Sequence, residues 1–506
     1  MFPVLENLGL RVASHGAFEV LPADRAPVRV EEFSLLPRDA LALLDDGIRD
    51  LVTEAFDAVW SGTAEDDELN QLVARAGLSW REVMVLRAVS AYLRQAGTLF
   101  TTAYVARTLR AHRPITRLLV DLFKARFDPR PGGEAREHQV RGLLEGELAA
   151  IDNLTDDRLL RSFLSVITGT MRTSYFQVDQ RGDPKPYLVL KLEPSGFEFL
   201  PRPRPLVETF VYSSRVEGLH LRSARVARGG IRWSDRPEDY RTEVLGLMRA
   251  QLVKNAVIVP QGAKGAFVVK RPPAVTHMHA LAEEVRHGYS TFVRGLLDVT
   301  DNLVDGVVVH PAATVCHDGA DPYLVVAADK GTATFSDLAN GIAAEHDFWL
   351  GDAFASGGAT GYDHKALGVT ARGMWESLRR HLGELGIDPT HDRFTVVGIG
   401  DMSGDVFGNG MLLSDRIRLV AAFDHRHIFL DPDPDSASSF SERQRLFATP
   451  GSSWADYRPE LFSEGGGVYL RTATSVPLTP QVGGCSASRP TGCRRTSWSA
   501  PCCGHQ

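Results

Sequence analysis

Apolar residues recur at helical spacing through the first third of the chain. Residues 41–59, 80–95 and 114–127 place apolar side chains three or four positions apart, which predicts amphipathic helices. Helical periodicity resumes from residue 139 and continues to about residue 172. We therefore expect a helical domain over residues 35–175.

The pattern then changes to the short apolar and alternating runs that are typical of strands. Runs at 187–192, 208–212 and 219–226 predict a sheet, and a further apolar run lies at 323–327. Helical segments separate some of these runs. The sequence therefore predicts an α/β protein with a mixed-sheet domain over residues 183–375.

The passage 226–271 concentrates candidate chemistry in a predicted strand, helix and strand. Gly229 and Gly230 form a predicted turn that can bring the backbone close to a ligand, and Arg228 and Arg232 add permanent positive charge. This combination suits a carboxylate or a phosphate. Two alternatives stay open: the arginines pair with nearby acidic residues, or they form a nucleic-acid patch, which the scarcity of aromatic residues among them disfavours.

Two lysines follow in the same passage. A helix is expected over 243–255 with Lys254 near its C-terminal end, where a cation also favours the helix dipole. A short buried strand is expected at 256–259, and GAKG at 262–265 is interpreted as a tight loop before a further strand. A solvated loop does not require a lysine between two small turns, so Lys264 is a candidate site residue.

Asp329 closely follows the apolar run 323–327, at the strand end where open α/β folds carry their chemistry. A turn-capping role is the alternative. Cys316, His317 and Asp318 suggest a metal site or a thiol nucleophile. Three adjacent residues cannot all converge on one ion, however, and no second ligand cluster has suitable spacing. We therefore expect no metal.

The passage that begins at residue 394 has the order of a dinucleotide-binding fingerprint. An apolar strand leads to Gly398 and Gly400, and Gly404 lies at the start of a helix expected over 405–418. In the usual fingerprint these glycines admit the pyrophosphate, and the helix N terminus faces it. The spacing here is G-x-G-x-x-x-G, one residue longer than usual.

A second strand at 417–423 supports the nucleotide interpretation. It ends in Asp424, where an acidic side chain accepts hydrogen bonds from ribose hydroxyls and disfavours the 2′-phosphate of NADP. His425, His427 and the nearby DPDPD run could instead bind a cation, which the prolines disfavour. We predict a partial Rossmann-like nucleotide domain over residues 385–480. Its predicted cofactor contacts are Gly398, Gly400, Asp401, Met402, Ser403, Gly404 and Asp424.

Composition limits the class of protein. A length of 506 residues suits about three domains, and 43% hydrophobic with 24% charged residues is typical of globular proteins. With 56 basic and 63 acidic residues the chain is mildly acidic, which disfavours nucleic acid as a partner. No run approaches the ~20 apolar residues of a membrane helix, and the first residues lack the features of a signal peptide. A cytoplasmic protein is therefore expected.

Five long motifs resemble the large NAD-dependent glutamate dehydrogenases. They are RVARGGIRWSDR, QLVKNAVIVPQGAKG, DPYLVVAADKGTATFSD, FASGGATGYDHK and VVGIGDMSGDVFGNGMLLS. The resemblance extends from the first residues to about Pro480. It implies oxidative deamination of L-glutamate to 2-oxoglutarate and ammonium with NAD as cofactor, and homo-oligomeric assembly. It also implies that residues 1–34 end a regulatory domain and that 183–375 binds glutamate.

The resemblance implies roles for individual residues. Lys264 resembles the catalytic lysine that activates the attacking water, because a poorly solvated lysine can exchange a proton near neutral pH. Asp329 resembles the acidic proton carrier, and Lys254 resembles the lysine that binds the α-carboxylate. The small glutamate dehydrogenases bind the side-chain carboxylate with a lysine, and either Arg228 or Arg232 takes its place here. The predicted substrate-binding set is Arg228, Gly229, Gly230, Arg232 and Lys254.

The two ends of the sequence limit the expected activity. In the resembled family the chain continues beyond both ends, with regulatory modules before it and the rest of the nucleotide domain after it. From Gly483 the sequence has no acidic residue and no Leu, Ile, Val or Phe, so residues 481–506 are expected to be a disordered tail that follows a change of reading frame. We therefore expect little turnover from this chain alone. The alternative function is a truncated, inactive homologue that retains only the substrate-binding half.

Overall fold

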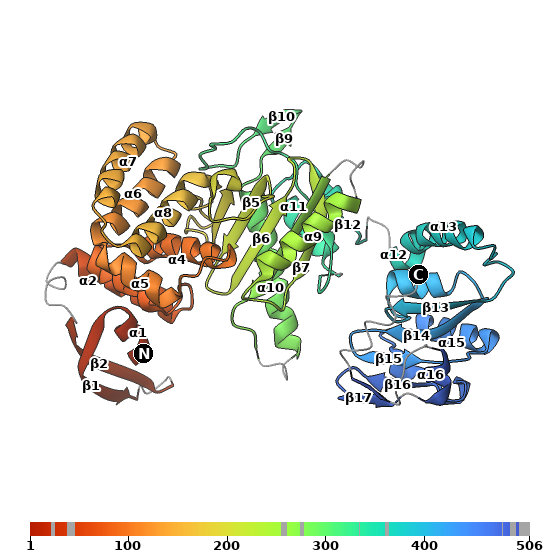
Figure 1. The fold of residues 1–506 in the computed structure, drawn as a ribbon. Helices are drawn as coiled ribbons and strands as arrows, with labels where there is room; N and C mark the ends of the chain where they lie inside the picture. The colour runs from red at the N-terminus through yellow and green to blue at the C-terminus, as the bar shows by residue number, and fades with distance from the viewer. Residues whose placement is uncertain are drawn as a thin grey trace. The chain divides into compact units, whose positions relative to one another are not determined.

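The computed structural model describes residues 1–21, 26–37, 46–254, 261–273, 278–332, 334–359, 364–477, 479–485 and 492–494. The chain divides into two compact units, 1–361 and 362–506. Each unit combines helices with a sheet (Figure 1), which confirms the predicted α/β class. In the described ranges, no helix is both long enough and apolar enough to cross a membrane.

The helical region of the first unit follows the predicted apolar periodicity. α4 (Trp80–Gln95) has the predicted bounds, and Ser79 and Glu82 cap its first turn reciprocally. The helix expected over 139–172 is instead two helices, because Asn153 caps a new helix by accepting hydrogen bonds from two backbone N–H groups. The other helices are α2 (Asp46–Trp60), α3 (Gln71–Ala76), α5 (Thr102–Ala111), α6 (Arg113–Phe127), α7 (Gly133–Ala149) and α8 (Leu154–Gly169).

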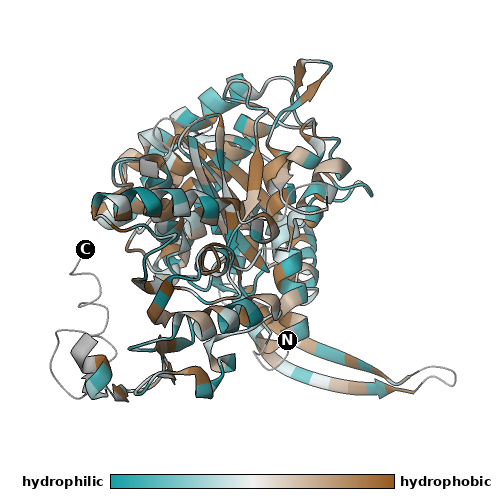
Figure 2. Cartoon of the chain, turned by 90° about the vertical axis from the view of Figure 1, so that its right-hand side faces the viewer, coloured by the Kyte–Doolittle hydropathy of each residue, from teal (hydrophilic) through white to brown (hydrophobic). Residues whose placement is uncertain are grey.

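An antiparallel ribbon precedes this helical region. After α1 (Phe2–Asn7), β1 (Leu10–Val20) pairs antiparallel with β2 (Val28–Pro37). Most of β1 is exposed, and its buried residue is Leu10 at the start of the strand. Figure 2 shows this ribbon extending from the N-terminal helix with polar and apolar residues intermixed.

An eight-stranded mixed sheet forms the centre of the first unit, in the order β12-β11-β7-β8-β6-β5-β4-β3. The four strands from β12 to β8 pair in parallel, and the pairs from β8 to β3 are antiparallel. The mixed sheet is therefore as predicted. Its strands are β3 (Thr170–Thr173), β4 (Leu188–Leu192), β5 (Val207–Tyr212), β6 (Val216–Arg222), β7 (Ala227–Trp233), β8 (Gln261–Val269), β11 (Val325–Ala328) and β12 (Ala355–Ser356).

Helices pack on both faces of this sheet. α9 (Tyr240–Lys254) links β7 to β8 and shares a core with the helical region and with side chains such as Leu221. α10 (Met278–Asp298) and α11 (Ser336–Glu345) share a second core with side chains such as Phe267. Sandwiching between helices explains why the strand sequences are largely apolar on both faces.

Two predicted turns are wrong. Gly229 and Gly230 lie inside β7, and the GAKG motif at 262–265 lies inside β8. Glycine gives the same sequence signal in a turn and in a strand where another backbone approaches closely, so the pattern could not separate the two. The strand expected at 256–259 and the side chain of Lys254 lie outside the described residues.

The glycines of β7 are required by the neighbouring strands. A Cβ on Gly229 would lie 1.6 Å from the carbonyl oxygen of Ala263 in β8. A Cβ on Gly230 would lie 3.0 Å from the carbonyl oxygen of Ala328 and 3.1 Å from the Cβ of Asp329. β7 thus presents bare backbone between β8 and β11.

The second unit contains the predicted strand, helix and strand. β13 (Phe394–Ile399) is parallel to β14 (Ile417–Phe423), and α14 (Asp405–Met411) lies between them in sequence. The predicted helix over 405–418 is too long, because the chain leaves the helix after Met411 and turns to begin β14. The sheet order is β13-β14-β15-β16, and β15 (His427–Leu430) and β16 (Gly467–Leu470) pair antiparallel.

Shorter elements complete the description. The region expected to be a disordered tail contributes α16 (Pro480–Cys485) and β18 (Gly492–Arg494), and β18 pairs with β17 (Ser475–Pro477). The remaining elements are β9 (Asn302–Val304), β10 (Val307–Val309), α12 (His364–Leu367), α13 (Val369–Glu384) and α15 (Ser436–Ala448), with short 3₁₀ turns η1 (Glu68–Asn70), η2 (Pro194–Gly196), η3 (Gly351–Ala353), η4 (Trp454–Asp456) and η5 (Pro459–Leu461).

Gly229→Ala tests the requirement for bare backbone. We expect the variant to lose about 1–3 kcal/mol of unfolding free energy or more, because the new methyl group must displace the Ala263 carbonyl. Chemical denaturation measures the change. Gly246→Ala is the matched control, since its Cβ would meet no atom within 4 Å on the exposed side of α9. The control should be neutral or gain about 0.5–1 kcal/mol. Equal stability of both variants would contradict the close approach of β7 and β8.

Candidate functional site

The structure brings Lys264 and Asp329 together across β7. Lys264 lies in β8, and Asp329 follows the last residue of β11, so the two side chains come from strands on opposite sides of β7. Two strand spacings amount to about 10 Å between backbones. Lys264 Nζ nevertheless forms an ion pair with Asp329 Oδ2. Gly230 lies beside this pair, since a Cβ on it would come within 3.1 Å of Asp329 Cβ.

The Asp329 carboxylate is held by further donors. Arg232 Nη2 donates to its Oδ1 at 3.2 Å and Arg232 Nε donates to its Oδ2 at 3.4 Å. The backbone N–H of Lys330 donates to Oδ1 at 2.7 Å. The Asp329 N–H donates at 3.1 Å to the hydroxyl of Thr332, which in turn donates to the Ile231 carbonyl at 2.6 Å. The aspartate therefore has a fixed position at the end of β11.

The charge state of Asp329 follows from these contacts. Burial by itself raises the pKa of the Asp329 carboxyl, but the hydrogen bonds from Lys264 and Arg232 and the lysine charge outweigh it and lower the pKa below its ordinary value. Asp329 is therefore a carboxylate at neutral pH and can accept a proton. Lys264 is only 9% exposed, so the pair meets little water.

Arg232 is anchored from its other side. Its Nη1 donates to Glu243 Oε1 of α9 at 2.5 Å, and the Ser234 hydroxyl donates to Glu243 Oε2 at 2.7 Å. Pairing with nearby acidic residues was one of the sequence alternatives, and it is what the structure shows for Arg232. Glu243 and Thr332 were not among the predicted site residues. Glu243 could have been identified from its place in the first turn of the helix that directly follows β7 in the sequence.

Arg228 has a different environment. It lies at the start of β7 with an exposed side chain, and within the described part of the chain its guanidinium has no hydrogen-bond or ion-pair partner. Arg232 is committed to Asp329 and Glu243. Of the two predicted carboxylate-binding arginines, Arg228 is the one with a free cation.

The predicted nucleotide-binding turn follows β13 in the second unit. A Cβ on Gly398 would lie 2.4 Å from the ring of Phe407, and a Cβ on Gly400 would lie 2.9 Å from Phe407 Cβ, so both glycines allow α14 to pack closely on β13. The Gly400 carbonyl also accepts a hydrogen bond from Trp454 Nε1 at 2.9 Å. Close packing of helix on strand is one purpose of glycine in dinucleotide-binding turns.

The rest of the turn is held by its own side chains. Asp401 accepts hydrogen bonds from the N–H and the hydroxyl of Ser403, at 3.0 and 2.5 Å. Met402 is 2% exposed and belongs to the core, and Gly404 is the N-cap residue of α14. The Met402 side chain therefore serves packing, while the backbone from Gly400 to Gly404 forms the surface of the turn.

Asp424 has a local partner set. Its Oδ1 accepts from the backbone N–H of Arg426 at 2.6 Å and from that of His427, and its Oδ2 lies 3.3 Å from His427 Nδ1. Burial raises the pKa of Asp424, but these hydrogen bonds lower it overall. The carboxylate thus holds the turn between β14 and β15.

Cys316, His317 and Asp318 do not converge on one point. Asp318 accepts from Arg172 Nε at 2.5 Å and from Lys191 Nζ at 2.6 Å, and His317 Nε2 lies 3.0 Å from the Arg126 carbonyl. A different trio, Asp301, His310 and Cys316, has its ligand atoms within 4.8 Å of one another. Both oxygens of Asp301 accept hydrogen bonds from the buried Arg172 guanidinium, at 2.5 and 3.0 Å. The Asp301 carboxylate of this trio is thus the partner of an arginine.

Comparison with known families identifies the chain. Residues 143–488 match the family model described as the bacterial NAD-glutamate dehydrogenase catalytic domain. The chain belongs to this family. Residues 64–129 match glutamate dehydrogenase helical motif 3, and residues 1–47 match the glutamate dehydrogenase ACT3 domain.

Similar curated proteins cover almost the whole chain. NAD-specific glutamate dehydrogenase of Halomonas elongata is 54% identical over 485 residues, which cover 95% of this chain and 30% of that protein. The proteins of the same name from Pseudomonas aeruginosa and Mycobacterium tuberculosis are each 52% identical, with 95% of this chain covered and 30% and 31% of theirs. The chain therefore spans about a third of the length of these relatives.

Solved structures of glutamate dehydrogenases are more distant. The hetero-hexameric enzyme from Thermus thermophilus, in a leucine-bound form, is 18% identical with a TM-score of 0.32, covering 63% of this chain and 68% of that one. The Plasmodium falciparum enzyme is 12% identical with a TM-score of 0.33, covering 77% and 66%. These overlaps are too low to support an argument about this chain.

Arg232→Gln tests the electrostatic support of Asp329. We expect a loss of about 2–4 kcal/mol of unfolding free energy at neutral pH, because Glu243 and Asp329 lose a shared partner. A lowered folded-state pKa gives stability that is present above the ordinary pKa of about 3.9 and is lost as pH falls through the folded value. Since the variant raises the pKa of Asp329, its deficit should shrink in acid. Chemical denaturation across pH measures this.

Arg236→Gln is the matched control for that experiment. Arg236 pairs with Asp239 on the surface, where both side chains are 48% exposed. Surface pairs contribute about 0–1 kcal/mol, so this variant should stay close to wild type at every pH. An equal loss of unfolding free energy in the two variants, or a loss that does not change with pH, would contradict the electrostatic support of Asp329 by Arg232.

Proposed function

We propose that this chain binds L-glutamate and takes part in its NAD-dependent oxidative deamination to 2-oxoglutarate and ammonium. Family membership supports the reaction, as do the names of relatives that are 52–54% identical. The observation that carries the proposal is the buried ion pair between Lys264 and Asp329. Oxidative deamination needs a base and a proton donor at one carbon atom, and the two residues can act in these roles.

The paired charges suit the proton transfers of this reaction. The substrate ammonium must lose a proton before hydride leaves the α-carbon, and Asp329 as a carboxylate can accept it. Water must then add to the iminium carbon, and Lys264 can take the water proton once it has given up its own proton. Ammonia leaves as the carbonyl forms and takes up a proton to become ammonium. One further proton is released to solvent, which balances the reaction. Because Lys264 and Asp329 are paired, protons can pass between them.

Arg228 is our proposed partner for the side-chain carboxylate of glutamate. It is exposed at the start of β7, and guanidinium groups bind carboxylates through two parallel hydrogen bonds. Arg232 acts instead as a positioning residue for Asp329, because Asp329 and Glu243 occupy its donors. For the α-carboxylate we retain Lys254 on the sequence resemblance alone.

The second unit supplies our proposed contacts to NAD, which when bound accepts the hydride from the α-carbon. Gly398 and Gly400 fit this role, since they allow the close strand–helix packing of a dinucleotide-binding turn. The backbone from Gly400 to Gly404 would approach the pyrophosphate. Asp424 fits less well, because its carboxylate holds the turn that follows β14.

Several wider features remain proposals. The domain division over 35–175, 183–375 and 385–480 rests on the sequence pattern. Cytoplasmic location rests on composition, and homo-oligomeric assembly rests on the resemblance. The inactive-homologue alternative is not favoured, because the described residues include a complete lysine–aspartate pair.

Lys264→Ala and Lys264→Arg test the catalytic proposal. The sequence predicted little turnover from this chain alone, but the complete lysine–aspartate pair leads us to expect that wild type forms NADH from glutamate and NAD, as measured by NADH absorbance. Both variants should lose about 10²–10⁴-fold in kcat, since arginine keeps the positive charge but cannot give up its proton. Full activity in Lys264→Arg would show that charge alone suffices. Absence of turnover in wild type, with glutamate binding retained, would favour the inactive-homologue alternative.

Arg228→Gln tests recognition of the side-chain carboxylate. We expect KM for glutamate to rise by about 10- to 100-fold with a smaller effect on kcat, because a charged hydrogen-bond partner of the substrate is lost. Arg225→Gln is the control: it is also an exposed arginine of this segment, but it donates to the Ala320 carbonyl at 2.9 Å. A rise in KM of equal size in both variants would indicate a general effect of charge and would contradict the assignment.

A further inference from the structure

A separate cavity of the first unit has a volume of 620 Å³ and shares no lining residue with the Lys264–Asp329 site. This volume lies within the range of about 300–1,000 Å³ that is usual for small-molecule pockets. The lining comes from five segments: the residues that follow α2, the loop 178–187, the turn between β5 and β6, α10, and the end of α11. We propose that this cavity binds a small anion through a phosphate or carboxylate group.

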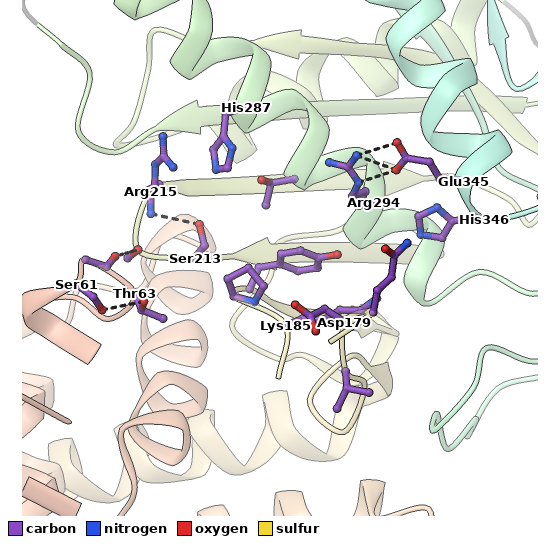
Figure 3. Close-up of a pocket in the computed structure, with 17 residues that line it drawn as sticks. Ser61, Thr63, Asp179, Lys185, Ser213, Arg215, His287, Arg294, Glu345 and His346 are labelled. Atoms are coloured by element: carbon purple, nitrogen blue, oxygen red, sulfur yellow. Dashed lines mark hydrogen bonds and ion pairs between the residues drawn. The ribbon is translucent and has the colours of Figure 1, made fainter. Parts of the chain in front are cut away.

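One wall of the cavity is a single face of α10. His287, Thr291 and Arg294 are four and three residues apart, which places them on the same side of a helix. Figure 3 shows His287 and Arg294 directed toward the same space from this helix, with Arg215 beside them from the β5–β6 turn. A helix and a short turn hold these groups on the rigid part of the fold.

The two arginines of the wall have exchangeable partners. Arg294 pairs with Glu345 at 2.8 Å, and these side chains are 38% and 54% exposed. Arg215 pairs with Glu284, and the arginine side chain is 49% exposed. Glu284 is 16% exposed, whereas both partners of the Arg294–Glu345 pair are in contact with solvent. Surface ion pairs are weak compared with buried ones, so Arg294 is the arginine that an incoming anion can recruit more easily.

Two polar groups of the wall have no partner in the described structure. Thr291 is 8% exposed, and its hydroxyl has no hydrogen bond to any described residue. His287 likewise has none. Buried polar groups are ordinarily hydrogen-bonded, so the Thr291 hydroxyl at the cavity wall is a ready donor for a ligand oxygen.

The electrostatic environment of His287 agrees with an anion site. Burial lowers the pKa of the imidazole, and the positive charges of Arg215 and Arg294 lower it further against the opposing charge of Glu284. At His287, therefore, the charges of the two arginines outweigh that of Glu284.

The rest of the lining also favours an anion. The lining has two acidic residues, and both are already engaged. Asp179 Oδ1 accepts from the backbone N–H groups of Arg181 and Asp183 at 2.8 and 3.0 Å, and Glu345 pairs with Arg294. Hydroxyl groups from Ser61, Thr63 and Ser213 line the cavity as well. Guanidinium and hydroxyl donors together match the oxygens of phosphate or carboxylate.

Isothermal titration of the full chain with inorganic phosphate and, separately, with citrate tests the proposal. The titrations are run at fixed ionic strength in chloride buffer. We expect saturable binding of at least one of the two at one site, and the tighter ligand identifies the preferred group. Thr291→Val should weaken this binding by about tenfold, because it removes one hydrogen bond and keeps the side-chain shape. Arg294→Gln should weaken it further.

Arg286→Gln is the matched control. Arg286 is an exposed arginine on α10 outside the lining of this cavity, so the variant makes the same change of charge without touching the cavity. It should bind as wild type does. Lack of saturable binding to either probe, an equal loss in the control, or unchanged binding in both cavity variants would overturn the proposal. Should Arg294→Gln fail to fold by circular dichroism, the charge-neutral Thr291→Val decides.

Discussion

The bare backbone of β7 is the constraint on which the candidate site depends. β7 lies between β8 and β11, and its neighbours leave no room for a Cβ at Gly229 and little at Gly230. Gly230 also lies beside the ion pair that Lys264 forms with Asp329 from two strands away. A larger residue at these positions would both push the strands apart and obstruct the ion pair. Packing and chemistry therefore impose the same requirement here.

Some charged side chains at the site pair with one another, and one remains exposed. Asp329 is shared by Lys264 and Arg232, and Arg232 is in turn fixed by Glu243. This arrangement keeps one carboxylate ionised in a nearly dry environment without an unpaired buried charge, which would be costly. It also removes Arg232 from the set of groups available to substrate and leaves Arg228 exposed. Arginines four residues apart in one strand thus have different tasks.

The sequence could predict elements whose signals are local. The bounds of α4 follow from apolar spacing and a capping box, and β14 spans the seven predicted residues, six of which are apolar. Gly229 was mistaken for a turn because the sequence does not show which strand lies beside it. That Lys264 meets Asp329 depends on a strand order of β11, β7 and β8, which only long-range pairing determines. The anion cavity draws on five distant segments and had no sequence signal at all.

The position of the ion pair across β7 also makes it sensitive to the width of the sheet. Lys264 and Asp329 flank β7 from the two strands beside it. The distance between their backbones is therefore set by two strand spacings and not by one. The contact between Lys264 and Asp329, and with it proton exchange between them, therefore depends on the register of β8, β7 and β11.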